Sequence, residues 1–212
     1  CDDSWAIEAH FIAPDARHSI TITKETVTIR DMTSGKIVNR FVLRVPAEDP
    51  DDIQVASSYD NKIIALATKK QVSFWEPSTG QKIKELPEDD EGTGEMFGFS
   101  PDGQIFVYGG ASNENKINVI RYMSQKEVLL LEETFPYFAI SPDSKTIASI
   151  NAEKNLVLTS LADTDAEPVV GEDSIEDNLT SGDDFGLVFS PDGSKIALYG
   201  PNGVTLFDCK TA

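Results

Sequence analysis

A short turn motif recurs along this chain at a nearly constant interval, and this repeat is the feature that most restricts the possible folds. The motif reads FGFSPDG at 97–103, FAISPDS at 138–144 and VFSPDGS at 188–194, with weaker copies FIAPDAR at 11–17 and VASSYDN at 55–61. The last of these keeps only the aspartate of the motif. The five aspartates are Asp15, Asp60, Asp102, Asp143 and Asp192, which lie 45, 42, 41 and 49 residues apart. This regular spacing predicts one supersecondary unit per repeat, as in propellers and solenoids.

Each repeat contains four candidate strands. A short apolar run precedes the turn and another follows it, and Pro with Asp-Gly favours a tight reversal between the two. A third run alternates apolar and polar residues, as in VTIRD (27–31), VSFWE (72–76), INVIR (117–121) and VTLFD (204–208). A second turn and a fourth run follow, as in IVNRFVL (37–43). Alternation with a period of two is typical of strands, so we expect an all-β fold of four-stranded antiparallel sheets.

Several of these residues resemble the WD40-repeat family of β-propellers. The segments 99–103 and 189–193, both Phe-Ser-Pro-Asp-Gly, match the family's turn between the first two strands of a blade. Phe74-Trp75-Glu76 and Leu206-Phe207-Asp208 match the strand that ends in the family's Trp-Asp dipeptide. The resemblance extends over nearly the whole chain and implies a β-propeller that acts as a scaffold. The family's Gly-His pair and a complete Trp-Asp dipeptide are absent, and other propellers with the same turn are the alternative.

We expect a single WD40-like propeller domain, or a fragment of one, over residues 1–212. Its repeats span about 6–52, 53–95, 96–135, 136–184 and 185–212. The fourth repeat is the most degraded, and the fifth stops after its third strand. A five-bladed ring closed by residues 1–5 and an incomplete ring, completed by further blades or subunits, are therefore both open. Ring closure would bring Cys1 close to Cys209, within possible reach of a disulfide.

The composition excludes several functions. The chain has 18 basic and 36 acidic residues, a net charge of −18, which disfavours binding to nucleic acid. No run of 18 apolar residues is present, so we expect no transmembrane segment. Two cysteines and two histidines leave little for a zinc site, and no phosphate-binding glycine motif occurs. We therefore expect no cofactor, no metal and no catalytic residue.

Nearly all of the net charge falls in the four segments that are expected to connect one repeat to the next. These segments, 46–52, 87–95, 132–135 and 171–184, hold 17 acidic residues in 34 positions and no Lys or Arg. The other 178 positions are almost neutral, with 19 acidic and 18 basic residues. Gathered at one rim, the segments would give a focused negative potential suited to a basic protein or peptide. Solvated loops without a partner, and a divalent-cation site, are the alternatives.

These observations predict a non-enzymatic scaffold for protein–protein interaction that docks a basic partner on an acidic loop face. The candidate interaction surface combines acidic residues with flanking aromatic residues: Trp5, Asp49, Asp51, Asp52, Glu88, Asp89, Asp90, Glu91, Glu95, Phe97, Tyr137, Asp183, Asp184 and Phe185. One alternative is a bacterial envelope lipoprotein anchored through a lipid on Cys1, and another is a sensor or enzyme with a site in a central channel. For the compartment, we favour the cytoplasm over attachment through Cys1.

Overall fold

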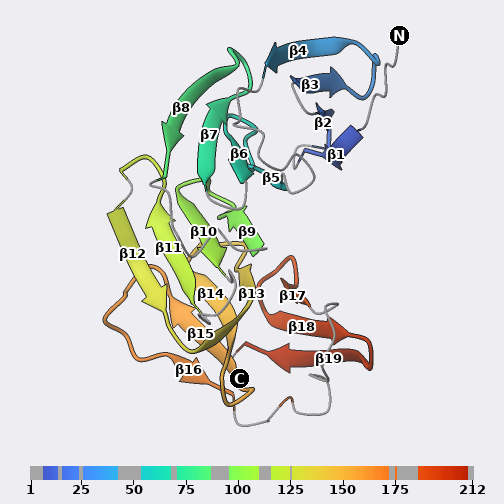
Figure 1. Cartoon of the computed structure of the whole chain (residues 1–212). Coiled ribbons are helices and arrows are strands. Elements are labelled where there is room, and N and C mark those ends of the chain that lie inside the picture. Colours follow the sequence, from blue (N-terminus) through green and yellow to red (C-terminus); the bar gives the residue numbers. More distant parts are fainter. Residues whose placement is uncertain are drawn as a thin grey trace. The chain divides into compact units, whose positions relative to one another are not determined.

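Short strands joined by tight turns fold the chain into a series of antiparallel sheets (Figure 1). The computed structural model describes residues 7–13, 16–23, 26–42, 54–67, 71–86, 96–109, 116–124, 126–171, 175 and 186–209. Within these ranges the chain forms 19 strands in five sheets and no helix. The prediction of an all-β fold with antiparallel sheets is therefore confirmed. The contacts divide the chain into two compact units, Cys1–Thr93 and Gly94–Ala212, each described by itself below.

The first unit contains two four-stranded meanders, in which each strand pairs with the next one along the chain. The first sheet consists of β1 (Ile7–Ile12), β2 (His18–Thr23), β3 (Thr26–Asp31) and β4 (Ile37–Val42). The second consists of β5 (Gln54–Ser57), β6 (Ile64–Ala67), β7 (Val72–Glu76) and β8 (Gln81–Glu85). The alternating runs 27–31 and 72–76 thus form the third strand of each sheet, as the sequence predicts.

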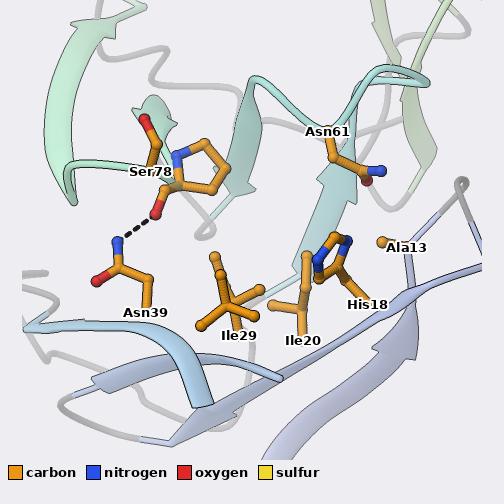
Figure 2. A pocket seen from close by; sticks show the side chains of 9 residues that line it. Ala13, His18, Ile20, Ile29, Asn39, Asn61 and Ser78 are labelled. Atoms are coloured by element: carbon orange, nitrogen blue, oxygen red, sulfur yellow. Dashed lines mark hydrogen bonds between the residues drawn. The ribbon is translucent and has the colours of Figure 1, made fainter. Parts of the chain in front are cut away.

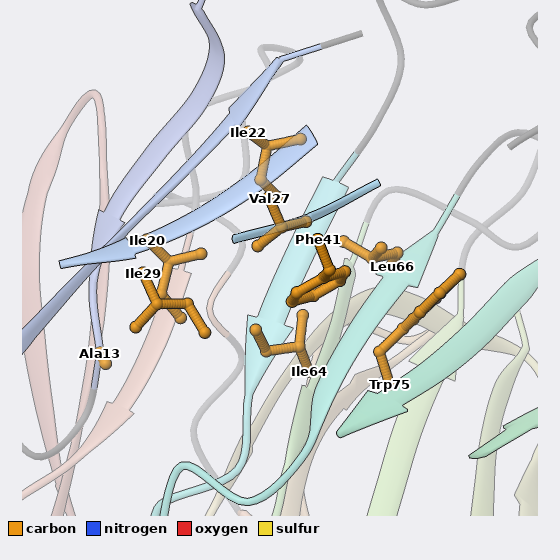
Figure 3. Close-up of a cluster of buried hydrophobic side chains, with 9 residues drawn as sticks. All are labelled: Ala13, Ile20, Ile22, Val27, Ile29, Phe41, Ile64, Leu66 and Trp75. Atoms are coloured by element: carbon orange, nitrogen blue, oxygen red, sulfur yellow. The ribbon is translucent and has the colours of Figure 1, made fainter. Parts of the chain in front are cut away.

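The core of the first unit lies between these two sheets (Figure 3). The period of two along β2 and β3 places alternate apolar side chains on one face. That face packs against β6 and β7, and Phe41 of β4 stacks on Trp75 with ring centroids 5.8 Å apart. The buried members of this core are Ala13, Ile20, Ile22, Val27, Ile29, Phe41, Ile64, Leu66 and Trp75.

The second unit contains three further meanders. The third sheet is formed by β9 (Met96–Phe99), β10 (Ile105–Gly109), β11 (Ile117–Arg121) and β12 (Lys126–Leu131). The fourth is formed by β13 (Thr134–Ile140), β14 (Thr146–Asn151), β15 (Leu156–Ser160) and β16 (Val169–Val170). The fifth is formed by β17 (Gly186–Phe189), β18 (Lys195–Gly200) and β19 (Gly203–Asp208).

Apolar side chains fill both interfaces of the fourth sheet. One of its faces carries Ile147, which packs with buried residues of β10 and β11. The other carries Ala148 and Ile150, which pack with Ile196 and Leu198 of β18. A sheet that is covered on both faces must be apolar on both, and this explains why β14 is buried at four consecutive positions, 147–150.

The repeated turn has the same hydrogen bonds in four repeats. In the third repeat the Ser100 hydroxyl donates to Asp102 Oδ1 (2.6 Å) and accepts a bond from the Ile105 N–H (3.0 Å). The same pair of bonds recurs at Ser58, Ser141 and Ser190, each with the aspartate two residues later. The second copy of the motif therefore keeps its serine as well as its aspartate, which corrects the sequence analysis. This Ser-x-Asp spacing, rather than Pro-Asp-Gly, defines the turn.

The residue after each aspartate has a positive φ angle. The angles lie between 53° and 71° at Ala16, Asn61, Gly103, Ser144 and Gly193. Glycine adopts this region without strain, whereas the other residue types enter it only when the surrounding bonds hold them there. The prediction of tight turns at 102–103 and 192–193 is confirmed.

The outer strands of the last two sheets are reduced. β16 has only two residues, which agrees with the degraded sequence of the fourth repeat. Within the described residues the fifth sheet has three strands, and β19 pairs only with β18. Val204 and Leu206 of β19 are 66% and 65% exposed, so this sheet has an apolar outer face.

Candidate functional site

The strand order determines where the acidic segments and the Ser-x-Asp turns lie on each sheet. The acidic segment 87–95 precedes β9, and the turn that begins at Ser100 follows it. β13 and β17 are flanked in the same way, by 132–133 and 171–184 before the strand and by a Ser-x-Asp turn after it. Each of these three strands thus runs from an acidic connection at one end of its sheet to a Ser-x-Asp turn at the other.

Most of the residues in the predicted interaction surface lie outside the described ranges. These are Trp5, Asp49, Asp51, Asp52, Glu88, Asp89, Asp90, Glu91, Glu95, Asp183, Asp184 and Phe185. Of the two remaining residues, Phe97 is half-buried, with its ring centroid 5.9 Å from that of Phe106. Tyr137 is half-buried within β13. The ring of Phe97 therefore belongs to an aromatic cluster on the third sheet.

The described part of the acidic face lies at the start of β13. Glu132 and Glu133 are exposed between β12 and β13. The Ala152 N–H, in the turn between β14 and β15, donates to the Glu133 carbonyl (2.7 Å). This bond brings exposed Glu153, the next residue in that turn, to the same edge of the sheet. We call Glu132, Glu133 and Glu153 the acidic edge; sequence reasoning missed Glu153, which belongs to no acidic run.

A buried anchor connects the longest acidic segment to the same sheet. Ile175 is 3% exposed and packs in the core between the fourth and fifth sheets. Its N–H donates to the carbonyl of Lys154 (3.1 Å), which follows Glu153 in the β14–β15 turn. Ile175 thus attaches the segment 171–184 to the turn that carries Glu153 of the acidic edge.

A second candidate lies in the first unit, between its two sheets. It is a pocket of about 150 Å³ (Figure 2). Its lining combines apolar side chains with polar ones: Ala13, His18, Ile20, Ile29, Val38, Asn39, Asn61, Pro77 and Ser78. Asn39 Nδ2 donates to the carbonyl of Pro77, which connects β4 of one sheet to the β7–β8 turn of the other. No signal in the sequence indicates this pocket, because strands of the first sheet and turns of the second line it, and only the fold brings these segments together.

Hydrogen bonds in the Ser-x-Asp turns lower the pKa of Asp60, Asp143 and Asp192 and so favour the ionised form of these three carboxyl groups. The Ser190 hydroxyl, with the backbone N–H and hydroxyl of Ser194, lowers the pKa of Asp192 to about 2. The pKa of Asp143 is lowered for the same reason, by the Ser141 hydroxyl and the Lys145 N–H. A carboxylate that accepts several hydrogen bonds is a poor proton donor or acceptor near neutral pH. These residues therefore stabilise the turns.

The described part of the chain contains neither a candidate metal site nor a helix that could span a membrane. No group of three or more His, Cys, Asp or Glu side chains is placed there to hold a metal ion. No helix among the described residues is long and apolar enough to span a bilayer. Cys209 is a half-buried free thiol, and its predicted partner Cys1 lies outside the described ranges, so their pairing stays a prediction.

Comparison with known proteins identifies the fold and no family. No family model matches the chain, and no curated protein matches it. Among solved structures, 1358 chains match, so the architecture is common and by itself indicates no activity. One of these is hydrazine synthase of Kuenenia stuttgartiensis, with a TM-score of 0.64 and 21% identity over 92% of this chain. The match covers 56% of that chain, so the present sequence corresponds to little more than half of its length.

Proposed function

We propose that the five sheets are blades of a WD40-like β-propeller, a non-enzymatic scaffold that docks a basic protein or peptide on its acidic face. The observation that carries this proposal is the position of the charge. Of 36 acidic residues, 17 fall in four inter-sheet segments that contain no Lys or Arg. Successive meanders with a common strand order support the architecture, and an acidic segment precedes the first strand of the second, third, fourth and fifth sheets.

On this proposal, the acidic edge is part of the surface that recognises the basic partner. Glu132, Glu133 and Glu153 are exposed, so each single ion pair with a lysine or arginine contributes little. Their combined field acts over a longer distance and accelerates the encounter with a basic chain. Half-buried Tyr137, in the strand that begins beside these residues, supplies apolar contact area. The charges then determine the association rate, and the aromatic contact slows dissociation.

The second unit offers a matched pair of variants to test the proposal. One variant neutralises the acidic edge with Glu132→Gln, Glu133→Gln and Glu153→Gln. The control neutralises three equally exposed acids between β15 and β16, with Asp163→Asn, Asp165→Asn and Glu167→Gln. Both variants lose three negative charges, but the control residues lie at the end of the sheet that carries the Ser-x-Asp turns.

The probe is a fluorescent oligolysine peptide with one tryptophan, measured by stopped-flow mixing and anisotropy. We expect the edge variant to associate several-fold more slowly and the control to behave as the unmodified chain does. Binding should weaken steeply from 0.1 M to 1 M salt, as the Debye length falls from about 10 Å to about 3 Å. A third variant, with Glu88, Asp89, Asp90 and Glu91 neutralised, extends the test to the longest acidic run. Equal association rates for the edge and control variants would show that the acidic residues are solvent-exposed loop residues that bind no partner.

A further inference from the structure

We propose that the pocket between the two sheets of the first unit is a second docking site, which takes one compact apolar side chain of a peptide. This site goes beyond the acidic face in both position and chemistry. It lies at the opposite end of the sheets, since Asn61 belongs to a Ser-x-Asp turn and Pro77 and Ser78 to the β7–β8 turn. A single partner could contact this end without touching the acidic segments.

The size of the pocket limits its occupant. Its volume is about 150 Å³, and an apolar cavity of that size accommodates benzene. Ala13, Ile20 and Ile29 form the floor and are at most 5% exposed. A phenyl ring or a branched aliphatic side chain fits this space.

The lining selects a neutral ligand. None of its nine residues is Asp, Glu, Lys or Arg, although a quarter of the chain is charged. An ionised group buried there would find no carboxylate, lysine or arginine in the lining as its partner, and His18 is the one titratable side chain among the nine residues. The floor therefore favours a side chain made of carbon and hydrogen.

The rim explains why we expect a peptide rather than a free hydrocarbon. Asn39 is already engaged, since its Nδ2 donates to the Pro77 carbonyl and its Oδ1 accepts a bond from the Arg40 N–H. Asn61 Oδ1 accepts a bond from the Ser57 hydroxyl. Within the described residues, no bond is made by Asn61 Nδ2 or by the hydroxyl of exposed Ser78. These two groups are the type that pairs with the amides on either side of a peptide side chain.

The test uses N-acetyl-phenylalanine amide, which carries one phenyl ring between two amide groups. N-acetyl-glycine amide, which lacks the ring, is the ligand control. Backbone amide NMR signals of the ¹⁵N-labelled chain follow both titrations. We expect saturable shifts at Asn39, Asn61 and Ser78 for the phenylalanine compound alone, with a dissociation constant of about 1 mM, as is typical of such a small ligand.

One substitution in β4 tests the position of the site, and a second controls for its chemistry. Val38→Asp places a carboxylate at the mouth of the pocket, where Val38 is 58% exposed. Val42→Asp makes the same change in the same strand, at a residue that is 61% exposed and does not line the pocket. Because both residues are exposed, both variants should fold, and their unfolding temperatures verify this.

We expect Val38→Asp to weaken binding at least tenfold and Val42→Asp to leave it unchanged. The affinity should also be nearly the same at 0.1 M and 1 M salt, because the ligand is neutral. This separates the result from that for the acidic face, whose binding is salt-dependent. The absence of saturable shifts, or equal binding by the two variants, would overturn the proposal.

Discussion

The two glycines in equivalent β-turns of the first unit allow a backbone cost to be separated from a packing cost. Gly35 follows β3 and Gly80 follows β7, and their φ angles are +69° and +71°. Each donates its N–H to the carbonyl four residues earlier at 2.8 Å, from Gly35 to Asp31 and from Gly80 to Glu76. The two turns therefore have the same conformation, and an alanine at either position is strained to a similar extent.

The surroundings of the two positions differ. A Cβ atom on Gly35 would meet no atom within 4 Å. A Cβ atom on Gly80 would lie 2.4 Å from Cβ and 2.8 Å from Cγ of Phe41. Since Cβ is fixed to the backbone of β4, a rotamer change of Phe41 cannot relieve the contact. Either the turn or β4 must move, which disturbs the stacking of Phe41 on Trp75.

We expect Gly35→Ala to lower the free energy of unfolding by about 1 kcal/mol, through the positive φ angle alone. Gly80→Ala adds the cost of overpacking, about 1–3 kcal/mol, so its total loss is about 2–4 kcal/mol. The difference between the two variants is the packing cost. This packing cost exceeds the backbone cost because Phe41 is buried, with only 8% of its surface exposed.

Urea unfolding followed by tryptophan fluorescence measures this difference. The chain has two tryptophans, so Trp5→Phe makes Trp75, which lies in the affected core, the sole reporter. The slope of the transition should be the same in both variants, because a changed slope indicates a changed unfolded state or an intermediate. Equal losses for Gly35→Ala and Gly80→Ala would refute the argument from the Phe41 contact.

Three further outcomes are expected in the second unit. Gly193→Val should lower the free energy of unfolding, measured in urea, by about 1 kcal/mol or more. The loss comes from the φ angle of +71°, since the added Cβ meets only Pro142 Cδ, at an ordinary 3.6 Å. Hydrogen bonds, first from the Ser190 hydroxyl, lower the pKa of Asp192 from 3.8 to about 2. The ionised Asp192 carboxylate therefore contributes stability that is present above pH 3.8 and is lost as the pH falls through 2. Unfolding midpoints between pH 5 and pH 2 should therefore fall less steeply in Asp192→Asn. Burial and then the charge of Asp208 raise the pKa of the Cys209 thiol. Alkylation of Cys209 by iodoacetamide at pH 8 should therefore be slower than that of a cysteine peptide, and faster in Asp208→Asn than in the unmodified chain. Equal rates for the chain and the peptide would contradict this.

The strands could be predicted from the sequence because their signal is local. The alternation in 72–76 and 204–208 reflects which side chains enter a core, and the structure places both runs in third strands. The serine of the second turn was overlooked because the familiar Pro and Gly are absent there. Ser58 nevertheless makes the same bonds as Ser100, since the turn depends on a hydroxyl and a carboxylate two residues apart.

The candidate sites depended on information that is not local. Glu153 lies at the acidic edge because a backbone bond holds its turn against Glu133, and no run of acids indicates this. Phe97 is half-buried, with its ring beside that of Phe106, and its role as an anchor for a partner stays a prediction. The pocket depends on a contact between Asn39 and Pro77, which are 38 residues apart. Local sequence patterns predict strands and turns. Predicting sites of this kind also requires knowing which distant segments lie side by side in the fold.

The apolar outer side of β19, which within the described residues pairs only with β18, has a consequence for the colloidal behaviour of the protein. The strand's sequence GVTLFD contains no lysine and no proline, the residues with which natural proteins often block the edges of sheets, and its one charged residue is Asp208. Exposed Val204 and Leu206 give the strand an apolar outer surface. The net charge of −18 keeps molecules apart while salt is low, so the acids that we propose to attract a basic partner also act as a barrier to aggregation. Light scattering should therefore show clustering that sets in as salt rises or as acid neutralises the carboxylates.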